Sequence, residues 1–123
     1  MIKEIGKFKA IGDETRFRIL RILIKAQKEL CACEIINILK KPQYTISKHL
    51  GQLVNMELIN EKRIGRMMFY YLNENIINSK LYEAINSFDF LITDSEEYKG
   101  FINDINSLNA ILEGKRDNSC KTH

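Results

Sequence analysis

Two cysteines in the first third of the chain are the residues best suited to chemistry. Cys31 and Cys33 are separated by one residue, and Cys120 lies near the C-terminus. The N-terminal residues MIKEIGKFK lack the apolar core of a secretory signal, so we expect a cytoplasmic protein whose thiols are reduced. Three cysteines are also an odd number, which does not fit a structural disulfide framework. The cysteines instead indicate metal ligation or redox chemistry.

A second group of side chains is suited to binding double-stranded DNA. A helix that enters the major groove needs short polar or basic side chains near its N-terminus to reach the base edges. A neighbouring hairpin needs cations at its tip to hold the adjacent phosphates. The predicted DNA contacts are Gln43, Tyr44, Thr45, Ser47 and Lys48 on a helix and Lys62, Arg63 and Arg66 on a hairpin.

The charge distribution favours the same region. The chain carries a net charge of +3. Residues 40–66 contain six Lys/Arg and two Asp/Glu, whereas residues 67–117 contain four and nine. This asymmetry predicts that a polyanion binds the middle of the chain, with an ordinary solvated surface as the alternative.

Length and composition predict a single globular unit. The chain has 123 residues, of which 45% are hydrophobic. Because no window approaches the roughly 20 apolar residues that span a bilayer, we expect no membrane contact. We expect one domain over residues 1–114 and a flexible C-terminal tail over residues 115–123.

Hydrophobic periodicity predicts the helices that position these side chains. Asp13 is a good N-cap for a second helix, on whose solvent face we expect Arg16, Arg18 and Arg21. Pro42 ends the third helix, because the residue before a proline disfavours the helical region. Helices are expected over residues 2–10, 13–27, 31–39, 43–55, 76–92 and, from a capping box at Thr93 and Glu96, up to Gly114.

Two apolar runs after the fourth helix predict a hairpin. Residues 59–64 and 67–72 flank Gly65 and Arg66, where glycine supplies the turn. Two short helices followed at once by a hairpin define a winged helix-turn-helix. The predicted fold class is therefore mainly α with a small β-hairpin, consisting of about six helices and a two-stranded wing.

The first and fifth helices carry apolar stripes larger than one small core needs, so we expect a homodimer. A twofold dimer would read an inverted repeat in its operator DNA. The two stripes consist of Ile2, Ile5 and Phe8, and of Leu81, Ile85 and Phe88.

Four segments resemble the ArsR (ArsR/SmtB) family of bacterial metal- and metalloid-responsive repressors. They are FKAIGDETRFRILRIL at 8–23, ELCACEI at 29–35, QYTISKHLGQL at 43–53 and RIGRMMFYYL at 63–72. ELCACEI resembles the start of the third-helix metal box of the family's arsenic, antimony and cadmium sensors. The resemblance implies a repressor and not an enzyme. The resemblance also implies that this repressor needs no cofactor to bind DNA and leaves its operator when As(III) or Sb(III) binds.

Thiolates are soft donors, which thiophilic ions such as As(III) and Sb(III) prefer to oxygen. Positions i and i+2 of a regular helix are about 200° apart, so Cys31 and Cys33 could hold one ion only if the helix start unwinds. The family's arsenic pattern has a third cysteine where this chain has Ile36, and we predict that Cys120 supplies the missing donor. Two alternatives stay open: a Cd(II) or Pb(II) sensor, and a repressor that responds to oxidation of Cys31 and Cys33.

Overall fold

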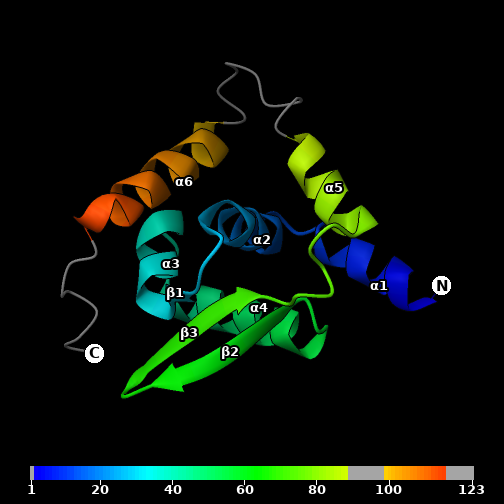
Figure 1. The fold of residues 1–123 in the computed structure, drawn as a ribbon, viewed down its shortest axis with the longest axis horizontal. Helices are drawn as coiled ribbons and strands as arrows, with labels where there is room; N and C mark the ends of the chain where they lie inside the picture. Colours follow the sequence, from blue (N-terminus) through cyan, green and yellow to red (C-terminus); the bar gives the residue numbers. More distant parts are fainter. Residues whose placement is uncertain (1, 89–98, 116–123) are drawn as a thin grey trace.

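Helix α2 (Glu14–Ala26) lies at the centre of the fold, with the other elements around it (Figure 1). The computed structural model describes residues 2–88 and 99–115. The other helices are α1 (Ile2–Ala10), α3 (Ala32–Leu39), α4 (Gln43–Asn55), α5 (Lys80–Ser87) and α6 (Lys99–Ala110), which continues into a wider turn over Ile111–Lys115. No helix in the described ranges is long and apolar enough to cross a membrane.

Local signals set the helix ends much as the sequence predicts. The carboxylate of Asp13 accepts a hydrogen bond from the Arg16 backbone N–H at 3.1 Å, which confirms the predicted N-cap of α2. Gln27 and Lys40 both have a φ of 56°, and this left-handed conformation ends α2 and α3. Lys40 therefore opens the short turn that joins α3 to α4.

A three-stranded antiparallel sheet replaces the predicted two-stranded wing. β2 (Ile59–Ile64) and β3 (Met67–Leu72) pair along their whole length, as expected. A third strand, β1 (Leu30–Cys31), pairs with the other edge of β3, so the order is β1-β3-β2. The prediction that the third helix starts at Cys31 is wrong, because pairing with β3 holds Cys31 in an extended conformation (φ −71°, ψ 149°).

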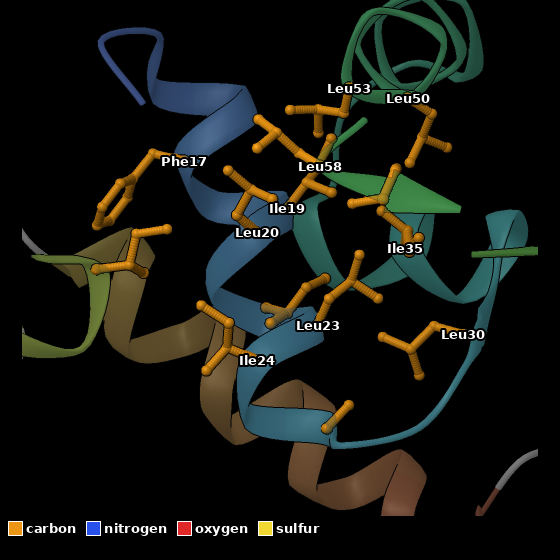
Figure 2. Close-up of a cluster of buried hydrophobic side chains, with 14 of the residues drawn as sticks. Phe17, Ile19, Leu20, Leu23, Ile24, Leu30, Ile35, Leu50, Leu53 and Leu58 are labelled. Atoms are coloured by element: carbon orange, nitrogen blue, oxygen red, sulfur yellow. The ribbon is translucent and has the colours of Figure 1, made fainter. Parts of the chain in front are cut away.

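The main hydrophobic core lies between α2, the helix-turn-helix pair α3 and α4, and the inner end of the sheet (Figure 2). Apolar burial of this kind is the dominant force that holds α3 and α4 against α2. The side chains at its centre, each at most 1% exposed, include Ile19, Leu20, Leu30, Ile35, Leu50, Leu53 and Leu58.

Two arginines of α2 are buried, so the expectation that Arg18 and Arg21 face solvent is wrong. Arg18 donates two hydrogen bonds of 2.7 Å to the carboxylate of Asp104 in α6 and one of 3.3 Å to the carbonyl of Leu39 at the end of α3. Arg21 donates to the carbonyl of Phe101 at 2.8 Å. The hydrogen bonds that Arg18 donates to Asp104 outweigh the effect of burial and raise the pKa of Arg18. These contacts fasten α6 to α2 and to the end of α3.

The predicted dimerisation stripe on the fifth helix belongs to the chain's own core. Leu81 and Ile85 are 4% and 1% exposed, and the ring of Phe88 lies 4.6 Å from that of Phe17. The helix also starts later than residue 76, because the hydroxyl of Ser79 caps it at the Tyr82 N–H. The predicted extension over 89–92 and the capping box at Thr93 and Glu96 lie outside the described residues.

Candidate functional site

The N-terminal half of α4 presents a polar surface free of acids. Gln43, Tyr44, Ser47 and Lys48 are exposed and Thr45 is half-buried. Tyr44 is the most exposed of the large hydrophobic side chains in the described part of the chain, at 79%. The opposite face of the helix is buried through Ile46, Leu50 and Leu53. The predicted DNA-reading residues of α4 therefore share one end of the helix, where base edges can be reached.

The middle of α4 is fixed by polar contacts that sequence reasoning missed. The side-chain carbonyl of Gln52 accepts a hydrogen bond from Arg16 of α2 at 2.9 Å. The Nδ1 atom of His49 lies 3.0 Å from the same oxygen. Arg16 also donates to the carbonyl of Ala10 at 3.0 Å. Because Arg16 and Gln52 are 36 residues apart, no local pattern could have revealed this support for α4.

Asp13 adds charge to this support. Its carboxylate lies 3.9 Å from Nε2 of the buried His49. Burial acts to raise the pKa of Asp13, but the hydrogen bond from the Arg16 N–H and the neighbouring His49 and Arg16 charges lower it below its ordinary value. The N-cap of α2 and the side chains behind α4 thus form one connected polar group.

The wing brings two of its predicted cations to the tip. Arg63 and Arg66 are both exposed and flank the turn at Gly65, whose φ of 64° is one that glycine tolerates best. Ile64 is 49% exposed between them. Two guanidinium groups at the end of a projecting hairpin are placed to contact DNA phosphates.

Lys62 differs from the tip residues. Its ammonium group lies 3.6 Å from the carboxylate of Glu29 and 5.9 Å from the centre of the Tyr71 ring. Both contacts turn it towards the base of the sheet. The structure therefore separates Lys62 from Arg63 and Arg66, although all three were predicted as phosphate contacts.

The cysteine pair lies where β1 meets α3. The sulfur atoms of Cys31 and Cys33 are 3.5 Å apart. We expected that the two side chains would meet only after the helix unwinds, and this is wrong because Cys31 already stands outside α3. With metal–sulfur bonds of about 2.3 Å and bond angles of about 90–110°, two thiolates on one ion lie about 3.3–3.8 Å apart. The observed separation falls within that range. Cys33 is disulfide-bonded in the structure, which differs from the expected reduced state, so an ion could bind both sulfurs only after reduction.

The surroundings of the pair are largely apolar. Cys31 is 3% exposed and Cys33 is half-buried. The Glu34 carboxylate accepts a hydrogen bond of 2.9 Å from the Cys31 backbone N–H and so serves as a helix cap. Burial, with Glu61 and Cys31 nearby, raises the pKa of Tyr70, the strand partner of Leu30.

A third donor for the cysteine pair does not come from the described residues. Ile36, at the position where a third cysteine was sought, is half-buried and carries no donor atom. Within residues 2–88 and 99–115, no three His, Cys, Asp or Glu side chains gather closely enough to hold a metal ion. The predicted third donor, Cys120, lies outside those ranges.

A helix-turn-helix followed by a basic hairpin, with a polar recognition surface, defines a winged-helix DNA-binding protein. Residues 13–61, from the cap of α2 to the middle of β2, match the family model described as bacterial regulatory protein, arsR family. The chain belongs to this family. It is a transcriptional regulator of the DNA-binding type and not an enzyme.

Three curated relatives support this assignment. An uncharacterised HTH-type transcriptional regulator of Methanocaldococcus jannaschii is 40% identical over 68% of this chain and 89% of its own length. The arsenic resistance regulator ArsR2 of Pseudomonas putida is 38% identical over 62% of this chain and 65% of its own. The cadmium resistance regulator CadC of Listeria innocua is 34% identical over 59% and 61%. The chain thus spans slightly less than two thirds of the arsenic and cadmium regulators.

Solved structures agree with the fold. HlyU of Vibrio cholerae superposes with a TM-score of 0.62 and 27% identity over 73% of this chain and 91% of that one. The transcriptional repressor PagR of Bacillus anthracis gives a TM-score of 0.57 and 30% identity over 68% and 90%. Both solved structures therefore share the fold of this chain over most of its length.

Proposed function

We propose that this regulator is a homodimeric repressor that leaves an inverted-repeat operator when As(III) or Sb(III) binds the thiolates of Cys31 and Cys33. The observation that carries the proposal is the 3.5 Å separation of the two sulfurs. Soft thiolates prefer these ions to harder metals. Cys120 is proposed as the third donor, because a trivalent metalloid is best satisfied by three sulfurs.

The position of Cys31 supports a direct link from ion to DNA. Cys31 pairs with Phe69 of β3, and β3 carries the wing together with β2. An ion that binds both sulfurs and a further donor would pull on the edge of the same sheet that holds Arg63 and Arg66. On the other side, α3 packs on α4, so movement of its first turn also reaches the recognition helix.

The proposed dimer rests on the apolar surface of α1, where Phe8 is 42% exposed. A twofold pair of recognition helices would contact half-sites about 34 Å apart, one turn of duplex DNA. Sedimentation of the protein with and without a duplex of that spacing tests the stoichiometry, and one protomer per operator would contradict it.

The test of the effector is release from operator DNA at fixed salt, with As(III), Sb(III), Cd(II) and peroxide compared in parallel. Cys31→Ser and Cys33→Ser should each keep operator affinity but lose release by As(III), because a hydroxyl is a harder and poorer donor. Cys120→Ser should weaken the response without abolishing it. In this variant, the number of sulfur neighbours of arsenic, measured by X-ray absorption, should fall from about three to about two.

The outcomes distinguish the remaining candidates. Release by As(III) that persists in both Cys31→Ser and Cys33→Ser removes the proposed site. Release by peroxide but not by As(III) favours the oxidation-responsive repressor, which the close contact of the two sulfurs also suits. Release by Cd(II) at lower concentrations than As(III) makes the protein a cadmium sensor, in line with its similarity to the Listeria regulator.

A further inference from the structure

A cavity of about 440 Å³ lies between the C-terminal turn of α2, the base of the sheet and the start of α5. It is separate from the cysteine pair and from the exposed surface of α4. Pockets that bind small organic molecules have volumes of about 300–1,000 Å³ and are mostly apolar, with a few converging polar groups. This cavity has the size and the mixed lining of such a site.

The inner wall of the cavity is apolar and aromatic. Leu23 and Ile24 of α2 are almost fully buried beneath it, and Ile77 at the mouth is 47% exposed. Tyr71 of β3 and Tyr82 of α5 contribute aromatic rings. Aromatic rings and branched aliphatic side chains together favour a flat apolar body of one or two rings.

The rim of the cavity is basic. Lys28 and Lys62 line it together with a single acid, Glu29. Lys62 is within 3.6 Å of the Glu29 carboxylate, so its ammonium group already lies at the rim. Lys28 is exposed, and the described part of the chain gives it no ion pair. The excess of positive charge matches one carboxylate on the ligand.

We propose that this cavity binds a small aromatic carboxylate, with the rings between Tyr71 and Tyr82 and the carboxylate against Lys62 and Lys28. Lys62 connects the site to DNA binding, because it lies in β2 opposite Phe69 and was predicted to contact phosphate. Lys62 is turned to the base of the sheet, so it would reach a phosphate only by leaving Glu29, and a ligand carboxylate that holds it at the rim would prevent that contact. Ligand and DNA would then weaken each other's binding by the same factor.

The experiment uses two probes of equal shape, naphthalene-2-carboxylate and naphthalene-2-carboxamide, titrated into the protein by ¹H–¹⁵N NMR. We expect shifts confined to the backbone of the lining residues and affinity about tenfold higher for the carboxylate, the size of a charge-assisted hydrogen bond. Lys62→Ala should remove most of that preference. Lys80→Ala, an exposed lysine of α5 outside the cavity, is the control.

A second pair of variants tests the mouth. Ile77→Asp should abolish carboxylate binding, because it places a negative charge where the anion enters. Ile102→Asp, at an exposed position of α6 outside the cavity, should not. Equal affinity for the two probes, or shifts scattered over α1 and α6, overturns the proposal. On operator DNA, naphthalene-2-carboxylate should reduce the salt slope by about 0.9, one phosphate contact, in the wild type but not in Lys62→Ala. An unchanged slope overturns the link to the wing.

Discussion

Arg18 and Asp104 show how one side chain can connect distant parts of this fold. Their side chains are 11% and 2% exposed and lie 86 residues apart in the sequence. Arg18 also holds the last carbonyl of α3. The sequence predicted the opposite environment for Arg18, since its spacing along α2 is indistinguishable from that of a solvent-facing arginine and its partner lies in a distant helix.

Removal of the Asp104 carboxylate should lower the free energy of unfolding substantially. Asp104→Ala leaves a buried guanidinium without its counter-charge, and we expect a loss of about 3–5 kcal/mol in the free energy of unfolding, measured with urea at pH 7. Asn103→Ala, at the exposed neighbouring position of α6, should change it by no more than about 0.5 kcal/mol. Equal effects of the two substitutions would show that α6 contributes no specific contact.

Asp13 should give stability that depends on pH. Its folded pKa lies below the ordinary value of 3.8, so the unfolded chain binds protons first as the pH falls. The cap's contribution is therefore present above pH 3.8 and is lost as the pH falls through the folded pKa. Asp13→Ala should cost about 1 kcal/mol at pH 7, and the difference from wild type should shrink below that range. Asp13→Asn keeps a capping oxygen that does not titrate, so its stability should lack this part of the pH dependence.

Among the elements, the hairpin and β1 differ in how far the sequence could predict them. The runs that became β2 and β3 flank a glycine, and their bounds were predicted to the residue. β1 has only two residues, which is too short to show any alternation, and it exists because β3 offers it an unpaired edge. Because the sequence did not predict β1, the contact between the sulfurs of Cys31 and Cys33 could not be predicted either.

The turn of the hairpin gives a test with two glycines of opposite expected effect. Gly65 has a φ of 64°, while Gly51 lies in α4, and an added Cβ meets nothing within 4 Å at either position. Gly65→Ala should destabilise by about 1–2 kcal/mol, the cost of a left-handed L-residue. Gly51→Ala should stabilise by about 0.5–1 kcal/mol through helix propensity. Thermal unfolding of both variants measures the contrast, and a stabilising Gly65→Ala would contradict the turn geometry.

For the molecule as a whole, DNA binding should divide between α4 and the wing. Lys48→Ala removes a side chain that is predicted to read base edges, so we expect a loss of about 1–3 kcal/mol on operator DNA and little change on random duplexes. Arg66→Ala should weaken binding to both DNAs and reduce the salt slope by about 0.9. Lys80→Ala is the control for the loss of one exposed cation. Binding isotherms over a salt series give both quantities, and equal behaviour of Lys48→Ala and Arg66→Ala would remove the division of roles.

The core and the exposed polar face of α4 were largely predictable because both depend on local periodicity. Ile46 and Leu50 repeat at helical spacing on one side of α4, and Tyr44 and Lys48 repeat on the other. Contacts between elements were not predictable in this way. Leu81 and Ile85 make a stripe that suits a dimer as well as a core, and only the packing of α5 on α2 decides for the core.

The burial of Cys31 limits how fast an effector can reach its sulfur atom. A residue 3% exposed, in a strand paired to its neighbour, meets a reagent from solution only while that strand is briefly detached. At low effector concentration the reaction rate is proportional to that concentration. At high effector concentration it levels off at the rate at which β1 opens. A regulator that responds through this sulfur therefore has a maximum speed built into its fold. Even in a large excess of effector, the protein would leave its operator no faster than β1 detaches from β3.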